Sequence, residues 1–137
     1  MMEFHRGRLI DHLHLRVANV EASAKFYRAI LTALGKDAGI REGLDYFNAD
    51  ELWIDAADGE TSRAHLAFQA IDHAAVHRFY EAALEAGGKD NGEPGERHYH
   101  PGYYAAFVLD PDGNNIEAVY HGPVIQNVES VVIQPDG

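Results

Sequence analysis

Apolar residues change from alternating to helical spacing twice along the chain. Residues 9–17 alternate between apolar and polar side chains, which is typical of a strand with one buried face. Apolar residues then recur at helical spacing over residues 20–34, and a glycine stops the pattern. Residues 64–70 and 73–86 repeat this order, and Asn19 and Asp72 are plausible N-caps of the two helices. Each stretch therefore predicts a strand followed by a helix.

The two stretches also match residue by residue when they are aligned at an offset of 53 positions. His12 then matches His65, and the Phe-Tyr pair at 26–27 matches the pair at 79–80. The match runs without gaps over about 28 positions, but two copies are too few for a solenoid. We infer a duplicated unit whose copies are related by a pseudo-two-fold axis.

Short extended segments follow each predicted helix. They lie at 44–48 and 51–57 in the first unit, and at 103–110 and 114–121 in the second. The turn Asp-Pro-Asp-Gly-Asn joins the last two, since proline presets one backbone angle and glycine accepts a positive one. Each unit is most simply βαβββ. The glycine- and proline-rich residues 91–102 are expected to form a polar loop.

The length of the chain predicts one compact domain over residues 1–137. Module one is expected at about residues 8–58 and module two at about residues 62–122. Residues 123–137 are expected to be an added tail with one short strand at 130–133.

Composition and charge exclude several partners and chemistries. Eleven basic and 22 acidic residues give a formal charge of −11, which argues against nucleic acid or an anionic membrane surface as the main partner. The absence of cysteine excludes disulfides and thiolate chemistry. No apolar run approaches the roughly 20 residues that span a membrane, and the first residues lack the apolar core of a signal peptide. We therefore expect a soluble, cytoplasmic protein.

Three motifs in this order and spacing carry a family resemblance: DHLHLRVANVEASAKFYRAIL, HLAF and DPDGNNIEAV. The chain resembles the vicinal oxygen chelate superfamily, also called the glyoxalase/bleomycin resistance/dioxygenase family, over roughly residues 9–122. The resemblance implies an α+β fold in which two tandem βαβββ modules form a curled mixed sheet around a metal-containing cavity. It also implies a homodimer that acts on a small-molecule substrate.

The same resemblance implies a metal site. The family's ligand positions fall on His12, His65 and Glu117, which would hold one divalent ion: Zn, Ni, Mn, Co or Fe. A fourth family position falls near Trp53, which cannot bind metal, and Asp55 is a weaker substitute two residues further on. Two imidazoles and one carboxylate form a facial triad that leaves coordination positions open for substrate. Whether the site forms within one chain or between two is left open.

Other polar and aromatic residues have competing interpretations. His100 and Tyr104 lie in or next to the expected loop and are candidates for moving protons, together with Glu117 as a catalytic carboxylate. The alternative is that the tyrosines pack at a strand edge and His100 faces solvent. His73 and His77 are expected on the solvent face of the second helix.

Three functions are compatible with these features. The first is a metal-dependent enzyme, of lyase or isomerase type, whose substrate chelates the metal through neighbouring oxygens. The second is an Fe(II) extradiol-type dioxygenase that cleaves a catechol ring. The third is a non-enzymatic drug-sequestering protein, which Trp53, Tyr103, Tyr104 and the acidic charge fit loosely.

Overall fold

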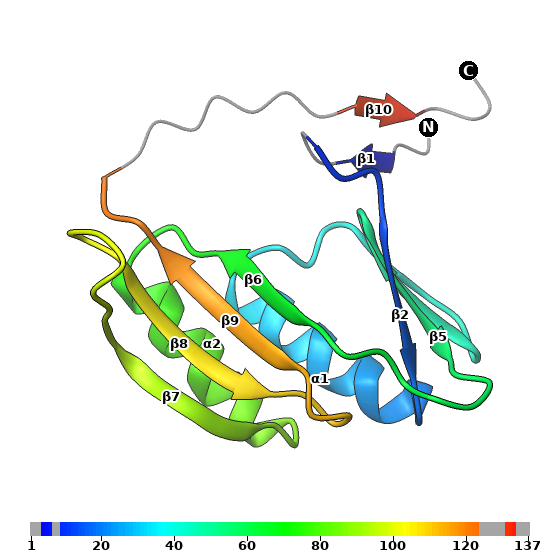
Figure 1. The fold of residues 1–137 in the computed structure, drawn as a ribbon. Coiled ribbons are helices and arrows are strands. Elements are labelled where there is room, and N and C mark those ends of the chain that lie inside the picture. The colour runs from blue at the N-terminus through cyan, green and yellow to red at the C-terminus, as the bar shows by residue number, and fades with distance from the viewer. Residues whose placement is uncertain (1–3, 7–8, 124–130, 134–137) are drawn as a thin grey trace.

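The protein contains two modules that have the same order of elements (Figure 1). The computed structural model describes residues 4–6, 9–123 and 131–133. Module one consists of β2 (Leu13–Val17), α1 (Val20–Ala33), β3 (Ile40–Glu42), β4 (Tyr46–Ala49) and β5 (Leu52–Ala56). Module two consists of β6 (His65–Gln69), α2 (His73–Glu85), β7 (Lys89–Glu96), β8 (Tyr104–Leu109) and β9 (Asn115–Tyr120).

Each module forms its own four-stranded mixed sheet with the same topology. The strand orders are β2-β5-β4-β3 and β6-β9-β8-β7. The first and last strands of each module pair in parallel, and the remaining pairs are antiparallel. The predicted α+β fold with two tandem βαβββ modules is therefore confirmed, and the internal repeat of the sequence is a repeat of topology.

Both helices begin at the residues that the sequence marks as caps. The side chain of Asn19 accepts a hydrogen bond from the Ala22 amide at 3.0 Å, and Asp72 accepts one from the Ala75 amide at 2.7 Å. These bonds satisfy amides of the first turn that have no partner within the helix. α1 and α2 pack against each other, and their buried aromatic residues contribute to one core.

The turn before β9 ties the two modules together. Asp110 is buried and accepts a hydrogen bond from the Tyr27 hydroxyl of α1 at 2.6 Å. Burial first, and then the charge of Asp110, raises the pKa of Tyr27 well above its usual value. The positive φ of +87° at Gly113 agrees with the predicted turn, and Asp112 accepts a hydrogen bond from the Ala18 amide.

The predicted polar loop over residues 91–102 is wrong in its first half. Residues 91–96 belong to β7, which pairs with β8 through an irregular register. β7 is the edge strand of its sheet, and Pro94 lies in the register irregularity between Gly92 and Gly95, where a residue without an N–H is tolerated. An edge position thus tolerates the composition that suggested a loop.

Two short terminal strands pair with each other. β1 (Phe4–Arg6) lies antiparallel to β10 (Val131–Ile133), and Figure 1 shows this pair apart from the two sheets. β10 confirms the short strand expected near the end of the chain, whereas β1 was not expected. The remainder of the predicted tail after residue 123 lies outside the described residues.

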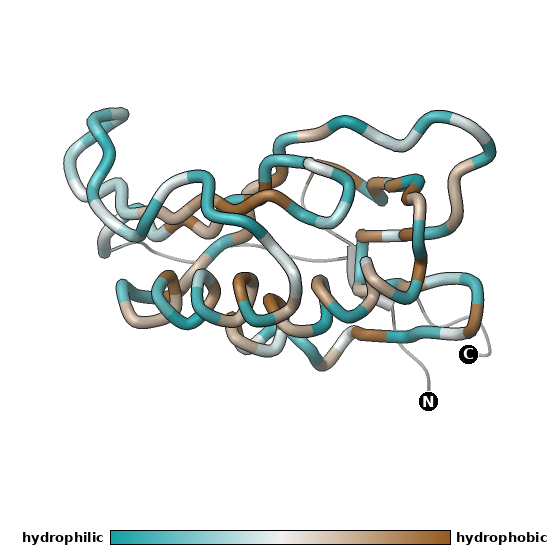
Figure 2. The backbone as a smooth tube through the Cα atoms, turned by 90° about the horizontal axis from the view of Figure 1, so that it is seen from below, coloured by the Kyte–Doolittle hydropathy of each residue, from teal (hydrophilic) through white to brown (hydrophobic). Residues whose placement is uncertain are grey.

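Apolar positions recur along the helices and strands, and hydrophilic positions follow the peripheral loops (Figure 2). In the part of the chain that the structure describes, neither helix has the length and apolar character needed to cross a membrane.

Candidate functional site

A buried carboxylate lies at the centre of the second sheet. Glu117 in β9 is only 1% exposed. Its Oε1 lies 2.8 Å from Nε2 of His65 in the neighbouring strand β6, and its Oε2 accepts a hydrogen bond from the Tyr103 hydroxyl. Because a buried carboxylate without partners is strongly unfavourable, these two contacts stabilise the side chain inside the sheet.

Tyr103 keeps its proton in this arrangement. Burial, followed by the hydrogen bond to Glu117, raises the pKa of Tyr103 to about 12. The phenol is therefore neutral near pH 7 and acts as a donor to the carboxylate. The carboxylate of Glu117 is thus held between a phenol donor and an imidazole, which is a suitable arrangement for binding a cation or accepting a proton.

An aromatic ring and a cation adjoin this cluster. Phe107 in β8 lies directly opposite Glu117 in the antiparallel register, and its ring centroid is 6.0 Å from that of His65. The Arg97 guanidinium lies over the same ring at 5.3 Å and donates to the Glu93 carbonyl at 2.7 Å. Arg97 thus places a positive charge beside the cluster of His65, Glu117 and Tyr103.

Module one carries a different polar cluster on β2 and β5. His14 Nε2 lies 2.6 Å from Asp55 Oδ1, and the Trp53 indole donates to Asp55 Oδ2 at 3.1 Å. The hydrogen bond to His14, and after it the one to Trp53, lowers the pKa of Asp55. Asp55 is therefore already engaged by two partners of its own module.

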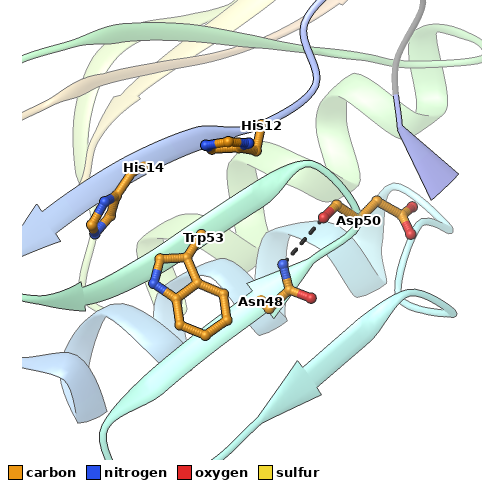
Figure 3. Close-up of a pocket in the computed structure, with 5 residues that line it drawn as sticks. All are labelled: His12, His14, Asn48, Asp50 and Trp53. Carbon is orange, nitrogen blue, oxygen red and sulfur yellow. Dashed lines mark hydrogen bonds between the residues drawn. The ribbon is translucent and has the colours of Figure 1, made fainter. Parts of the chain in front are cut away.

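A pocket of about 240 Å³ opens beside this second cluster (Figure 3). It is lined by His12, His14, Asn48, Asp50 and Trp53. Figure 3 shows the two histidines extending from one strand, while Trp53 and Asn48 come from neighbouring strands. The indole stacks on Tyr46 with a ring-centroid distance of 4.9 Å and an interplanar angle of 8°. The pocket therefore combines an aromatic wall with imidazole, amide and carboxylate groups.

The strand registers show which residues of the two modules are equivalent. Trp53 lies opposite His14, and Glu117 lies opposite Ala67. His14 matches Ala67 in the sequence repeat, so Trp53 occupies in module one the position that Glu117 occupies in module two. This agrees with the family resemblance, in which the fourth ligand position falls near Trp53.

One chain brings together two of the three predicted metal ligands. His65 and Glu117 are in contact, and their 2.8 Å separation suits two donors that bind one ion at about 2.0–2.2 Å each. His12 lies in module one, where its Nδ1 is 2.8 Å from Asp11 Oδ1. Among the residues that the structure describes, no group of three or more His, Cys, Asp or Glu side chains could hold a metal ion. The donor types fit a divalent metal, but a complete ligand set needs a further donor.

The hydrogen bonds of His100 and Tyr104, the predicted proton-transfer residues, go to other side chains than Glu117, although the His100 ring packs edge-on against Tyr103. His100 Nε2 is 2.9 Å from Nδ1 of His121, and the Tyr104 hydroxyl is 2.7 Å from Nε2 of His77. Tyr103, and not Tyr104, contacts the carboxylate. Tyr103 directly precedes β8, and the alternation of the expected segment 103–110 puts it on the face of Phe107, which lies opposite Glu117, so the sequence did contain a signal for its orientation.

Comparisons with known proteins agree with this fold. The family model described as Glyoxalase/Bleomycin resistance protein/Dioxygenase superfamily matches residues 9–118. A glyoxalase/bleomycin resistance protein from Albidiferax ferrireducens T118 is 28% identical, with a TM-score of 0.67, and the match covers 81% of this chain and 97% of that one. A glyoxalase/bleomycin resistance protein/dioxygenase family enzyme from Burkholderia phytofirmans PsJN is 20% identical, with a TM-score of 0.62 and coverages of 80% and 95%.

A mutant glyoxalase I from Zea mays is 21% identical with a TM-score of 0.57. The match covers 88% of this chain but 46% of the maize chain. At this identity, the maize and Burkholderia structures support the fold alone. The search of curated proteins found no match.

Proposed function

The chain belongs to the Glyoxalase/Bleomycin resistance protein/Dioxygenase superfamily, and from that membership we propose that it is a metal-dependent enzyme acting on a small molecule by lyase or isomerase chemistry. The observation that carries the proposal is Glu117, a buried carboxylate in contact with the His65 imidazole and the Tyr103 phenol. Burying a carboxylate is costly, and binding a cation is a physical reason to retain one there.

In this proposal His12, His65 and Glu117 hold one divalent ion. The bound ion would act as a Lewis acid toward neighbouring oxygens of the substrate. Glu117 balances part of the positive charge and can accept a proton from the substrate. Tyr103 fixes one carboxylate oxygen and limits its rotation, while Phe107 lies opposite Glu117 on the neighbouring strand.

We propose that a second copy of the chain completes the ligand set. His12 has a side chain that is 64% exposed, and His65 is 53% exposed, so both imidazoles are accessible from outside the chain. The two modules have equivalent topologies, so a two-fold dimer can set module one of one chain against module two of the other. His12 would then approach His65 and Glu117 of its partner.

Metal analysis tests the proposal. The protein is incubated separately with Zn, Ni, Mn or Fe(II), dialysed, and measured by mass spectrometry together with His65→Ala. We expect His65→Ala to retain about one ion per chain less than the wild type. His98→Ala removes an exposed histidine outside the cluster and is the matched control. Equal metal contents in wild type and His65→Ala for all four metals would overturn the proposal.

A second candidate function is the binding of a planar aromatic molecule without catalysis. The stacked Trp53 and Tyr46 rings beside the module-one pocket favour it, because they offer a flat apolar surface next to carboxylates. Trp53 is the single tryptophan of the chain, so its fluorescence reports directly on this pocket. Titration with a planar aromatic cation should quench Trp53 in wild-type protein and in His65→Ala alike. Unchanged fluorescence at saturating cation would count against this function.

A further inference from the structure

Two histidines of helix α2 and a tyrosine of strand β8 form a cluster that the proposed function does not use. His73 and His77 are exposed and lie four residues apart, so their side chains project from one face of the helix. The His73 ring stacks on Tyr104 with centroids 3.8 Å apart and an interplanar angle of 14°. The Tyr104 hydroxyl lies 2.7 Å from Nε2 of His77.

We propose that His73, His77 and Tyr104 form a second site for a transition-metal ion, with two imidazole nitrogens and one phenolate oxygen as ligands. Two histidines at this helical spacing can bind one ion together, and the His73 ring must turn off the face of Tyr104 to point a nitrogen lone pair at that ion. The 2.7 Å between His77 Nε2 and the Tyr104 oxygen is close to the roughly 2.8–3.0 Å that separates neighbouring donors bound at about 2.0–2.1 Å. Nitrogen and oxygen donors of this type favour Cu(II) most strongly among the first-row divalent ions.

The cluster is separate from the carboxylate of the candidate active site. Tyr104 lies opposite Tyr120 in β9, whereas Glu117 lies opposite Phe107. Tyr120 and Glu117 are three residues apart on one strand, and side chains at odd spacing project from opposite faces of a sheet. α2 packs on β8 and β9, so the histidine cluster occupies the helix-covered face and Glu117 the other.

The electrostatics of the cluster set the conditions for binding. His73 is the first residue of α2, where the helix dipole opposes a bound cation. Loss of the Tyr104 proton on binding would supply a negative charge that offsets this effect, and the overall charge of −11 also favours cations. Binding should therefore release a proton and strengthen as the pH rises.

This inference stands independently of the proposed function and changes how its test is interpreted. A chain with both sites can retain metal after His65→Ala, because the helix site is left intact. The number of ions lost on that substitution is therefore the informative quantity, rather than the total. Removing both sites requires a second substitution on α2.

The test is a Cu(II) titration against a competing chromophoric chelator in the His65→Ala background. We expect His77→Ala and His73→Ala each to weaken Cu(II) binding at least tenfold, while His98→Ala has no effect. Tyr104→Phe should keep the two imidazoles but abolish the visible phenolate-to-copper absorption band. Circular dichroism melts of each variant confirm that it is folded. Unchanged Cu(II) affinity in His77→Ala, or an absorption band that survives Tyr104→Phe, would overturn the proposal.

Discussion

Replacing Glu117 by glutamine distinguishes two roles of this residue, as a metal ligand or as a carboxylate that only stabilises the fold. The glutamine carbonyl can accept the Tyr103 hydrogen bond, and its amide can donate to a neutral His65 nitrogen. Both contacts of the native side chain are then retained without a buried charge. His65 is 53% exposed, so water can solvate its imidazole after the carboxylate charge is lost.

The expected magnitudes differ between the two roles. In Glu117→Gln the two hydrogen bonds of the side chain no longer involve a carboxylate, which costs about 1 kcal/mol for each bond. The variant also avoids the penalty of burying a carboxylate, and this offsets most of that cost. We therefore expect the free energy of unfolding to change by less than about 1.5 kcal/mol, which is a shift of roughly 6 °C in Tm for a domain of this size. Metal affinity should fall at least ~100-fold, equivalent to about 2.7 kcal/mol, because one charged ligand is lost.

A structural role predicts the opposite combination. If Glu117 only neutralised a buried cation, the substitution would destabilise the fold by about 3–5 kcal/mol and lower Tm by more than ~10 °C. A thermal melt and a metal titration on the same protein distinguish these cases. Glu81→Gln, which removes an exposed carboxylate from α2, controls for the change in net charge. Unchanged metal affinity combined with a collapsed Tm would refute the reasoning.

Three further predictions concern single contacts. Tyr103→Phe should destabilise the protein by about 1–3 kcal/mol at pH 7, because a buried carboxylate oxygen loses its donor, and urea unfolding measures this. The pKa of Tyr103 is raised to about 12 in the folded state. Wild-type stability should therefore decline between about pH 10 and 12, because only the unfolded chain has lost this proton there. The decline should be shallower in Tyr103→Phe. The pKa of Asp55 is lowered in the folded state, so its contribution to the free energy of unfolding is present above about pH 4 and is lost as the pH falls through the folded-state pKa. Stability should therefore depend less on pH over that acidic range in Asp55→Asn than in wild type. Identical acid titrations of the two proteins would contradict this. Gly88→Ala should cost about 1–3 kcal/mol in thermal melts, because a Cβ there would lie 2.7 Å from the Phe26 ring and 2.8 Å from a backbone carbonyl; an unchanged Tm would contradict the packing.

The sequence was informative where a local pattern determines the structure. Asn19 and Asp72 marked the helix starts because their side chains satisfy free amides of the first turn. The 53-residue repeat predicted the duplicated topology because equivalent residues occupy equivalent strands. The edge strand β7 was missed because glycine and proline weaken a central strand but are tolerated at an edge.

The candidate site depended on contacts that strand periodicity does not specify. The position of Glu117 on β9 followed from its motif, yet its complete burial reflects coverage of both faces of the strand. Alternation back from Phe107 puts Tyr103 on the face of Glu117, but it does not specify that the Tyr103 hydroxyl reaches the carboxylate. Tyr104 instead meets His73 and His77, since the tertiary packing of α2 against β8 brings these residues together.

Mixed dimers test most directly the claim that each metal site combines module one of one chain with module two of the other. His12→Ala and Glu117→Gln are purified separately in the His77→Ala background and then mixed, unfolded and refolded together. A heterodimer should recover one intact site, made from His12 of the Glu117→Gln chain and from His65 and Glu117 of the His12→Ala chain. We predict that metal binding returns in the mixture and in neither variant alone. A mixture that binds no more metal than its separate components, while the His77→Ala parent binds normally, would contradict the account.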